Sequence, residues 1–393
     1  MAEEISYVII TPYSLMKSRT GGIMARLLSR TDLELVAAKI LAPSAEFAYQ
    51  YAQLLENTIG KHNERAGRIL ADYVRENFSP LSDGRRERIL MLLFKGEDAC
   101  RKLYTIVGGL PSHREKDTFT GETIRDTYAD LIINPDGAVK HFEPAVLTPP
   151  DEQSSRDKLK LFMDFAEKEP NVVENIAGSE DTHQRTLTII KPENWRHPST
   201  KPGNIIDIFS RTGLRIVGCK LYQMSIAEAL EFYGPVQGVL RKKFATAIAE
   251  KVRGIIESEL GLKLDEGVLP KLTDAVGLPY ADDQFYQIIE FMSGSKPCDC
   301  PESDKGKPGK VKCLVLIYEG KDAVTKIREV LGPTDPSKAP SGTVRSDFGR
   351  SVMVNTAHAS DSPENAQREM KIVKIDSNDF CRIIKNYLEQ KGN

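Results

Sequence analysis

The feature that most constrains the fold of this chain is an internal repeat. Residues 29–44 read SRTDLELVAAKILAPS and residues 210–225 read SRTGLRIVGCKLYQMS, so Ser, Arg, Thr, Leu, Val and Lys recur at one fixed offset. Two further matches follow in the same order, between 93–108 and 317–332 and between 123–128 and 343–348. Three matches in one order imply that the chain carries two related domains, one after the other.

Both copies have the same predicted order of elements. Each begins with a strand and continues through a helix, a strand, a helical insertion, a strand and a helix. The strands are expected at 7–11, 33–41, 88–94, 186–191, 214–222 and 312–318, and the helices at 21–31, 98–107, 203–212 and 322–331. Alternation of this kind indicates an α/β (α+β sandwich) fold class. The order βαββαβ predicts two tandem ferredoxin-like sheets with helices on one face.

The boundary between the copies is expected in residues 167–184, which are polar and rich in turn-forming residues. The first domain would then span 1–166 and the second 185–393. The second copy is longer, and its insertion is expected around 234–312, where residues 240–260 have helical periodicity. Such an insertion could act as a lid or as an oligomer contact.

The composition argues against several classes of function. The formal net charge is −2, so nothing predicts bulk attraction to nucleic acid or to a membrane surface. No apolar run reaches the length of a transmembrane helix, and the N-terminus has no signal-peptide pattern. Six cysteines in 393 residues do not suggest a disulfide framework, so a cytoplasmic location is expected. Cys298, Cys300 and Cys313 are better explained as thiols of a Pro/Gly/Lys-rich loop than as metal ligands.

His358 stands out because it follows a short alternating segment and precedes a helix start. Residues 352–356 alternate in a way that predicts a strand or extended segment, and Ser362 with Pro363 predicts the helix N-terminus. His358 would therefore lie on the turn between them. A histidine on such a turn can be a hydrogen-bonded structural residue or a nucleophile, because neutral imidazole can attack phosphorus at neutral pH.

The motifs around this histidine resemble those of the nucleoside diphosphate kinase family. The second copy contains TLTIIKPENW at 186–195, AVTKIREVLGPTDP at 323–336, SGTVRSDF at 341–348 and NTAHASDS at 355–362, with a glutamate on the following helix. The resemblance spans about 190 residues of the second copy, interrupted by the insertion. It departs from the family pattern at Ala359, where the family has glycine, and at VMVN (352–355), which lacks a Gly-Arg pair.

The resemblance implies a reaction and a set of roles. The γ-phosphate of ATP would pass to a nucleoside diphosphate by a ping-pong route through phospho-His358, with Mg²⁺ bridging the outer phosphates. Glu369 and Ser360 would orient the imidazole, and Lys191 would assist catalysis. The nucleotide-binding residues implied by the resemblance are Lys191, Tyr233, Phe285, Ile288, Arg328, Thr334, Arg345, Val352 and Asn355.

The first copy has lost most of these residues. Thr11 stands in place of Lys191 and Tyr104 in place of Arg328, whereas Arg125 retains the arginine. Aligning the prolines puts Ala145 or Val146 where the histidine should be, and His141 could replace it only through a local rearrangement. The first copy would then keep the fold without catalysis. The resemblance implies that it pairs with the second copy as an intramolecular pseudo-dimer, and a homo-oligomer is also possible.

Two classes of function are the main candidates at this stage. One is the phosphotransferase, with nucleoside di- and triphosphates as its partners. The other is a non-catalytic nucleotide-binding or scaffold protein on the same fold, because the first copy shows that catalytic residues can be lost. A histidine kinase that phosphorylates proteins is a third reading. Formation of a phosphohistidine, and its transfer to GDP, would separate these functions.

Overall fold

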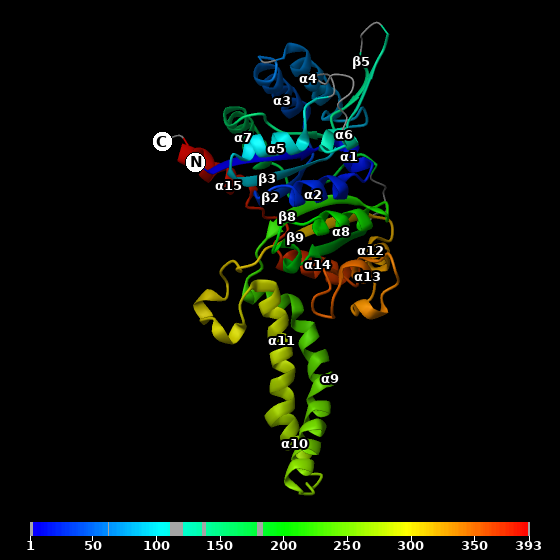
Figure 1. The fold of residues 1–393 in the computed structure, drawn as a ribbon, viewed down its shortest axis with the longest axis vertical. Helices are drawn as coiled ribbons and strands as arrows, with labels where there is room; N and C mark the ends of the chain where they lie inside the picture. The colour runs from blue at the N-terminus through cyan, green and yellow to red at the C-terminus, as the bar shows by residue number, and fades with distance from the viewer. Residues whose placement is uncertain (1–2, 62, 111–120, 136–138, 179–183, 392–393) are drawn as a thin grey trace. The chain divides into compact units, whose positions relative to one another are not determined.

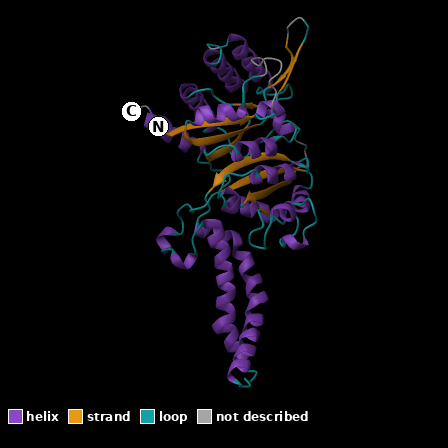
Figure 2. Cartoon of the chain, in the orientation of Figure 1, coloured by secondary structure: helices purple, strands orange, loops and turns teal. Residues whose placement is uncertain are grey.

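The computed structural model describes residues 3–61, 63–110, 121–135, 139–178 and 184–391 (Figures 1 and 2). The chain folds into two compact units: unit 1 comprises residues 1–221 and 314–393, and unit 2 comprises residues 222–313. Unit 1 contains the β-sheets, and unit 2 is helical. Within the described residues, no helix is both long enough and apolar enough to cross a membrane.

The first sheet of unit 1 has four strands in the order β2-β3-β1-β6. Its strands are β1 (Glu3–Ile10), β2 (Glu34–Leu41), β3 (Ile89–Glu97) and β6 (Val146–Leu147). β1 and β3 are antiparallel, and residues 5–10 of β1 and 89–94 of β3 are buried, which agrees with the largely apolar sequences of these two stretches. A separate two-stranded ribbon, β4 (Asp130–Ile133) with β5 (Val139–Glu143), extends from this half.

The second sheet has the order β10-β7-β9-β8, which repeats the order of the first sheet when equivalent strands are compared. Its strands are β7 (Gln184–Ile190), β8 (Arg215–Tyr222), β9 (Cys313–Gly320) and β10 (Ala357–Ala359). In both sheets the first and third strands of the copy lie in the centre, as the βαββαβ order predicts for a ferredoxin-like fold. The predicted fold class is therefore confirmed.

Helices of unit 1 cover these sheets, and the insertion of the first copy is helical, as predicted. In the first half the helices are α1 (Pro12–Met16), α2 (Thr20–Ser29), α3 (Ala45–Thr58), α4 (Glu64–Asn77), α5 (Ala99–Val107), α6 (Ile124–Tyr128) and α7 (Glu152–Ala166). In the second half they are η2 (Pro192–Trp195), α8 (Lys201–Ser210), α12 (Ala323–Leu331), η6 (Pro336–Lys338), α13 (Val344–Phe348), α14 (Pro363–Ile372) and α15 (Phe380–Lys391).

Two of these helices, α2 and α8, pack closely because each presents a glycine. A Cβ atom placed on Gly203 would lie 2.3 Å from the backbone nitrogen of Ala25, and one on Gly21 would lie 2.4 Å from that of Asp207. Only a residue without a side chain permits this approach. The close packing of the two halves therefore depends on glycine at these two positions.

Asn378 links strands β2 and β8, one from each half. The side-chain amide of Asn378 donates to the carbonyl of Ala38 in β2 at 3.0 Å and to that of Cys219 in β8 at 3.3 Å. The next residues, Lys39 and Lys220, are both buried, and each donates to two backbone carbonyls. The lysine shared by the repeated sequences therefore has the same structural role in both halves.

The last helix joins the core of the opposite half. α15 packs against α7, and its Phe380, Ile384 and Tyr387 are buried in the aromatic core that contains Phe47 and Phe162. Tyr387 Oη also donates to the Glu152 carboxylate at 3.0 Å. The core of the first half is therefore completed by the end of the chain.

Unit 2 is a helical hairpin with a loop region. It is built from α9 (Ile226–Leu260), α10 (Val268–Leu272), the short π-helix η3 (Thr273–Gly277), α11 (Leu278–Ser293) and the 3₁₀ helices η4 (Pro297–Asp299) and η5 (Glu302–Asp304). Helices α9 and α11 lie side by side (Figure 1). Arg241 on α9 binds Asp282 on α11 with two hydrogen bonds of 2.7 and 2.8 Å.

The cysteines of the loop region are free thiols. Cys298 is exposed, Cys300 is partly exposed, and Cys313 is buried at the start of β9. Among the residues that the structure describes, no three His, Cys, Asp or Glu side chains are grouped so that they could hold a metal ion.

Candidate active site

His358 lies on strand β10, directly opposite Ile189 of β7. The sequence-based expectation of a strand at 352–356, with His358 on the turn after it, is wrong, because the strand is formed by residues 357–359. Thr356 has a left-handed backbone with φ of 72°, which prevents the extended conformation from starting earlier. The helix start was predicted correctly: α14 begins at Pro363, and the Ser362 hydroxyl accepts a hydrogen bond from the Asn365 amide.

The His358 ring is held by a buried carboxylate. Its Nε2 lies 2.9 Å from Oε2 of Glu369, which is 5% exposed and comes from α14. The Ser360 hydroxyl donates to the same oxygen at 2.7 Å, and the Ser360 amide donates to the Leu187 carbonyl of β7. An acceptor at Nε2 fixes the ring orientation and favours the tautomer in which Nδ1 carries the lone pair. The sequence-predicted trio of His358, Ser360 and Glu369 is brought together in this arrangement.

Lys191 lies at the end of β7, close to the same strand. Its Nζ donates to Oδ1 of Asn355 at 2.6 Å, and its backbone amide donates to the Thr356 carbonyl. Burial lowers the pKa of Lys191 to about 8, the Glu193 carboxylate opposes that shift, and the nearby Arg345 charge adds to it. The lysine and one arginine are therefore neighbours beside the strand that carries His358.

Asn355 connects this lysine to two loops. Its side-chain amide donates to the Thr334 carbonyl at 3.1 Å and to the Val352 carbonyl at 2.8 Å. Asn355 itself is 1% exposed, whereas the side chains of Thr334 and Val352 are exposed. Asn355 thus links two other predicted binding residues, Thr334 and Val352, through their backbone carbonyls.

Arg345 supports the backbone next to His358. Its two terminal nitrogens donate to the carbonyls of Gly332 and Ala357, both at 3.0 Å. In the first half, Arg125 makes the equivalent bonds to Gly108 and Val146, at 2.6 and 3.0 Å. Because Arg125 makes these bonds in a half without the histidine, this bracing is a structural role that the sequence did not reveal.

Arg328 lies on α12, which packs against β10. Its side chain is exposed, so the guanidinium is accessible to a ligand. Tyr233, Phe285 and Ile288 belong to unit 2, where Tyr233 and Phe285 are buried among the helices. Their assignment as base-binding residues stays a prediction.

Two side chains near the site were missed by the sequence reasoning. Glu193 Oε1 accepts a hydrogen bond from the Thr356 amide at 2.8 Å, and Asn194 Nδ2 donates to the Thr356 carbonyl at 2.9 Å. Burial raises the pKa of Glu193. Together these residues hold Thr356 in its left-handed conformation. The sequence feature that could have identified them is the polar pair Glu193 and Asn194 directly after Lys191 and Pro192.

The first half shows what replaces this site. Leu147 pairs with Ile9 of β1 as His358 pairs with Ile189 of β7, and Arg125 binds the residue before Leu147 as Arg345 binds the residue before His358. Leu147 is therefore the equivalent of His358, and the expectation of Ala145 or Val146 at this position is wrong. The prolines are a poor guide to this alignment. Ala145 has a left-handed backbone and is the equivalent of Thr356, so it lies two residues before the position of the histidine.

The partner of the histidine is also changed. Lys158 stands 11 residues after Leu147, as Glu369 stands after His358, on the equivalent helix. It is fully buried and donates to the Thr58 hydroxyl at 2.8 Å, and burial lowers its pKa to about 8. Thr11, in place of Lys191, donates to the buried Glu143 at 2.7 Å. His141 is exposed on the β4–β5 ribbon, outside this network.

Comparison with known proteins places a family-model match in the second half of the chain. A family model described as nucleoside diphosphate kinase matches residues 308–377. A nucleoside diphosphate kinase of Helicobacter pylori is 32% identical over 187 residues, which cover 48% of this chain and 92% of the relative. One from Staphylothermus marinus is 29% identical over 190 residues, with the same shares covered.

The chain belongs to the nucleoside diphosphate kinase family. Among solved structures, a nucleoside diphosphate kinase of Pyrobaculum aerophilum is 25% identical, with a TM-score of 0.31, and the match covers 49% of this chain and 95% of that one. One from Encephalitozoon cuniculi is 22% identical, also with a TM-score of 0.31, and the match covers 50% and 95%. The two curated relatives named above each match about half of the present chain.

Proposed function

We propose that this protein is a nucleoside diphosphate kinase that transfers the γ-phosphate of ATP to a nucleoside diphosphate through phospho-His358. The observation that carries the proposal is the hydrogen-bonded chain from Ser360 through the buried Glu369 to Nε2 of His358. A buried carboxylate can hold an imidazole in one tautomer and stabilise the positive charge that forms on it. This arrangement leaves Nδ1 as the attacking atom.

The transfer would proceed in two half-reactions. His358 Nδ1 forms a bond to the γ-phosphorus while the bond from that phosphorus to the β–γ bridging oxygen breaks, and the nucleoside diphosphate leaves with the electron pair. A second nucleoside diphosphate then attacks the phosphohistidine and restores the ring. Protein groups mainly position the phosphates and offset their charge. Lys191 and Arg345 supply positive charge beside the strand, with Arg328 on α12.

The described residues are consistent with Mg²⁺ that arrives with the nucleotide. They contain no cluster of three metal-ligating side chains, and both the Glu369 carboxylate and Oε1 of Glu193 already accept hydrogen bonds. Mg²⁺ is commonly held through substrate phosphates with few protein ligands. When bound, it would offset negative charge on the β- and γ-phosphates. Lys191 and the arginines would then orient the nucleotide.

Labelling with γ-³²P ATP tests the proposed function. The expected product is a phosphoprotein that is labile in acid and stable in base, and addition of GDP should transfer the label to GTP within one turnover. A chain that never acquires label would support the non-catalytic alternative. Label that stays on the protein or moves to another protein would also contradict the proposed kinase.

The rate should depend on the charge of Lys191. Its folded-state pKa is about 8, so the ammonium form prevails below pH 8 and the neutral amine prevails above it. We expect kcat/KM for ATP to fall as the pH rises through about 8, because the neutral amine no longer attracts phosphate. A pH profile of phosphoenzyme formation measures this effect. The Lys191→Arg variant should be slower but should lack the fall near pH 8, since its guanidinium stays charged.

We also propose that the first half is a built-in partner for the catalytic half. The two halves are joined by the packing of α2 on α8, by the hydrogen bonds of Asn378 and by α15, which completes the core of the first half. The substitutions at Thr11, Leu147 and Lys158 leave the first half without the catalytic groups. The halves would thus form an intramolecular pseudo-dimer with one active site.

A further inference from the structure

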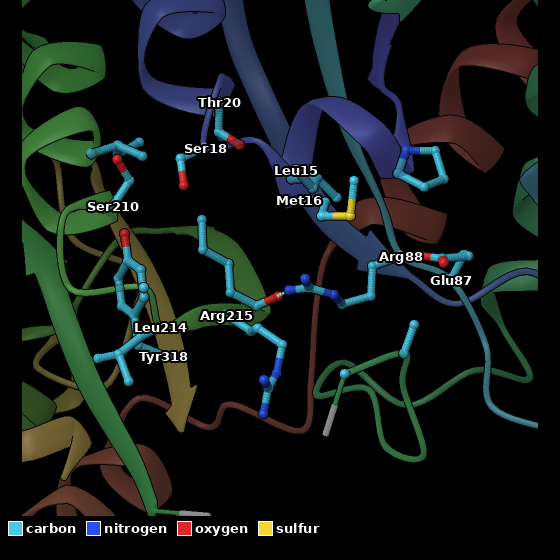
Figure 3. Close-up of a pocket in the computed structure, with 16 residues that line it drawn as sticks. Leu15, Met16, Ser18, Thr20, Glu87, Arg88, Ser210, Leu214, Arg215 and Tyr318 are labelled. Carbon is cyan, nitrogen blue, oxygen red and sulfur yellow. Dashed lines mark hydrogen bonds between the residues drawn. The ribbon is translucent and has the colours of Figure 1, made fainter. Parts of the chain in front are cut away.

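A cavity of about 320 Å³ lies within unit 1 where the two halves meet (Figure 3). The first half contributes α1, the segment that follows it and the residues just before β3, and the second half contributes α8 and the start of β8. None of the proposed catalytic or nucleotide-binding residues lines this cavity. It is therefore a separate feature, and the inference drawn from it does not depend on the proposed function.

Two arginines from different halves line this cavity. Arg88 precedes β3 and is 9% exposed, and Arg215 is the first residue of β8. Burial, followed by the nearby positive charge of Arg215, lowers the pKa of Arg88 to about 10. Figure 3 shows both side chains extending among the lining residues. A second positive charge beside the buried Arg88 is unfavourable unless an anion lies between the two or close by.

Nearby acidic groups offset this charge only in part. Glu87 also lines the cavity, and burial raises the pKa of its carboxyl group, which favours the neutral form. Glu319 acts on Arg88 from β9, but its carboxylate is bound to Arg185 at 2.9 Å. The lining therefore carries two guanidinium groups and one carboxyl group, which leaves an excess of positive charge.

Two polar atoms of the lining residues lack hydrogen-bond partners among the described residues. They are Nε of Arg215 and Oη of Tyr318, both buried. Leaving a buried donor unsatisfied costs about 1–3 kcal/mol. Arg88 has a structural partner for its guanidinium group, since its Nη1 donates to the Ile216 carbonyl at 2.6 Å. Arg215 Nε and the Tyr318 hydroxyl have no such partner in the part of the chain that the structure describes.

We propose that this cavity binds a small phosphate-bearing molecule of about the size of a nucleoside monophosphate. The guanidinium groups of Arg88 and Arg215 match the oxygens of a phosphate, and the Tyr318 hydroxyl can donate to the same ligand. Leu15, Met16 and Leu214 supply apolar surface for the remainder of the molecule. The volume lies at the small end of the range for ligand pockets, about 300–1,000 Å³, which favours a monophosphate over a triphosphate.

Binding at this position would stabilise the contact between the halves. A ligand that contacts both Arg88 and Arg215 binds the folded arrangement and not the unfolded chain, so it shifts the equilibrium toward the paired halves. The site would thus be regulatory, and the ligand would act on the pairing of the two halves.

Calorimetric titration of the full chain with AMP, inorganic phosphate and adenosine tests the proposal. The wild type should bind AMP at this site in addition to any binding near His358, and adenosine should not bind here because it lacks the anion. Arg215→Gln should weaken this class of AMP binding by at least ~10-fold while it preserves the other class. Arg68→Gln is the matched control, because Arg68 is an exposed arginine on α4 that pairs with Glu64.

A second variant keeps the test decisive if Arg215→Gln folds poorly. Tyr318→Phe removes a buried hydroxyl without a partner, so the ligand-free protein should be as stable as the wild type or more stable, while AMP binding weakens. Binding of inorganic phosphate with the same sensitivity to Arg215→Gln would identify the phosphate alone as the ligand. Unchanged AMP binding in both variants, or no binding to the wild type beyond the His358 site, would overturn the proposal.

Discussion

Replacing His358 with alanine is expected to abolish the labelled phosphoenzyme and to lower phosphotransfer to GDP by at least ~10⁴-fold, because the reaction loses its nucleophile. The substitution removes a side chain that is 21% exposed and leaves strand β10 intact. The fold should therefore survive, and the loss should reflect chemistry. Filter-bound label after incubation with γ-³²P ATP measures the first step, and a coupled GTP assay measures the second.

His141→Ala is the control for this experiment. His141 is exposed on β5 and represents the alternative in which the first half supplies a substitute histidine. We expect full labelling and full transfer in this variant. Residual labelling of His358→Ala that disappears in the double variant would show that His141 carries phosphate, and equal labelling of wild type and His358→Ala would contradict the assignment of His358.

The contacts within the candidate site could be predicted because its residues lie in short motifs of fixed spacing. The chain brings His358, Ser360 and Glu369 together through one strand and the next helix, so their contact is nearly local. The strand boundary at 352–356 was not predictable from alternation alone. Its position depends on Thr356, whose left-handed conformation is maintained by Glu193 and Asn194 from more than 160 residues away in the sequence.

The remaining features depend on contacts between distant segments. Nothing in the residues of α15 indicates that Phe380 and Ile384 complete the core of the opposite half. The replacement of Glu369 by Lys158 becomes visible only when β6 and β10 are matched by their strand partners. Conversely, the lysine repeated in both copies was visible in the sequence, but only the structure shows that Lys39 and Lys220 bind backbone carbonyls rather than a ligand.

Gly203→Ala is expected to destabilise unit 1 by about 3 kcal/mol, the upper part of the range for overpacked interiors. The added Cβ would lie 2.3 Å from the Ala25 nitrogen and 2.4 Å from the Gly21 carbonyl oxygen. Both atoms belong to the backbone of α2, so they cannot move aside as a side chain can. The helices must separate, and the contact between the halves that rests on them must loosen.

Denaturant unfolding followed by the fluorescence of Trp195, the single tryptophan, measures this effect within unit 1. Gly22→Ala is the matched control on the same helix: its Cβ would meet only the hydroxyl end of Tyr128, a side chain that can shift. Alanine is also the better helix former by about 1 kcal/mol, so Gly22→Ala should change the unfolding free energy by less than ~1 kcal/mol. If Gly203→Ala were equally mild, α2 and α8 could separate at little cost, and the pairing of the halves would have to rest on Asn378 and α15 instead.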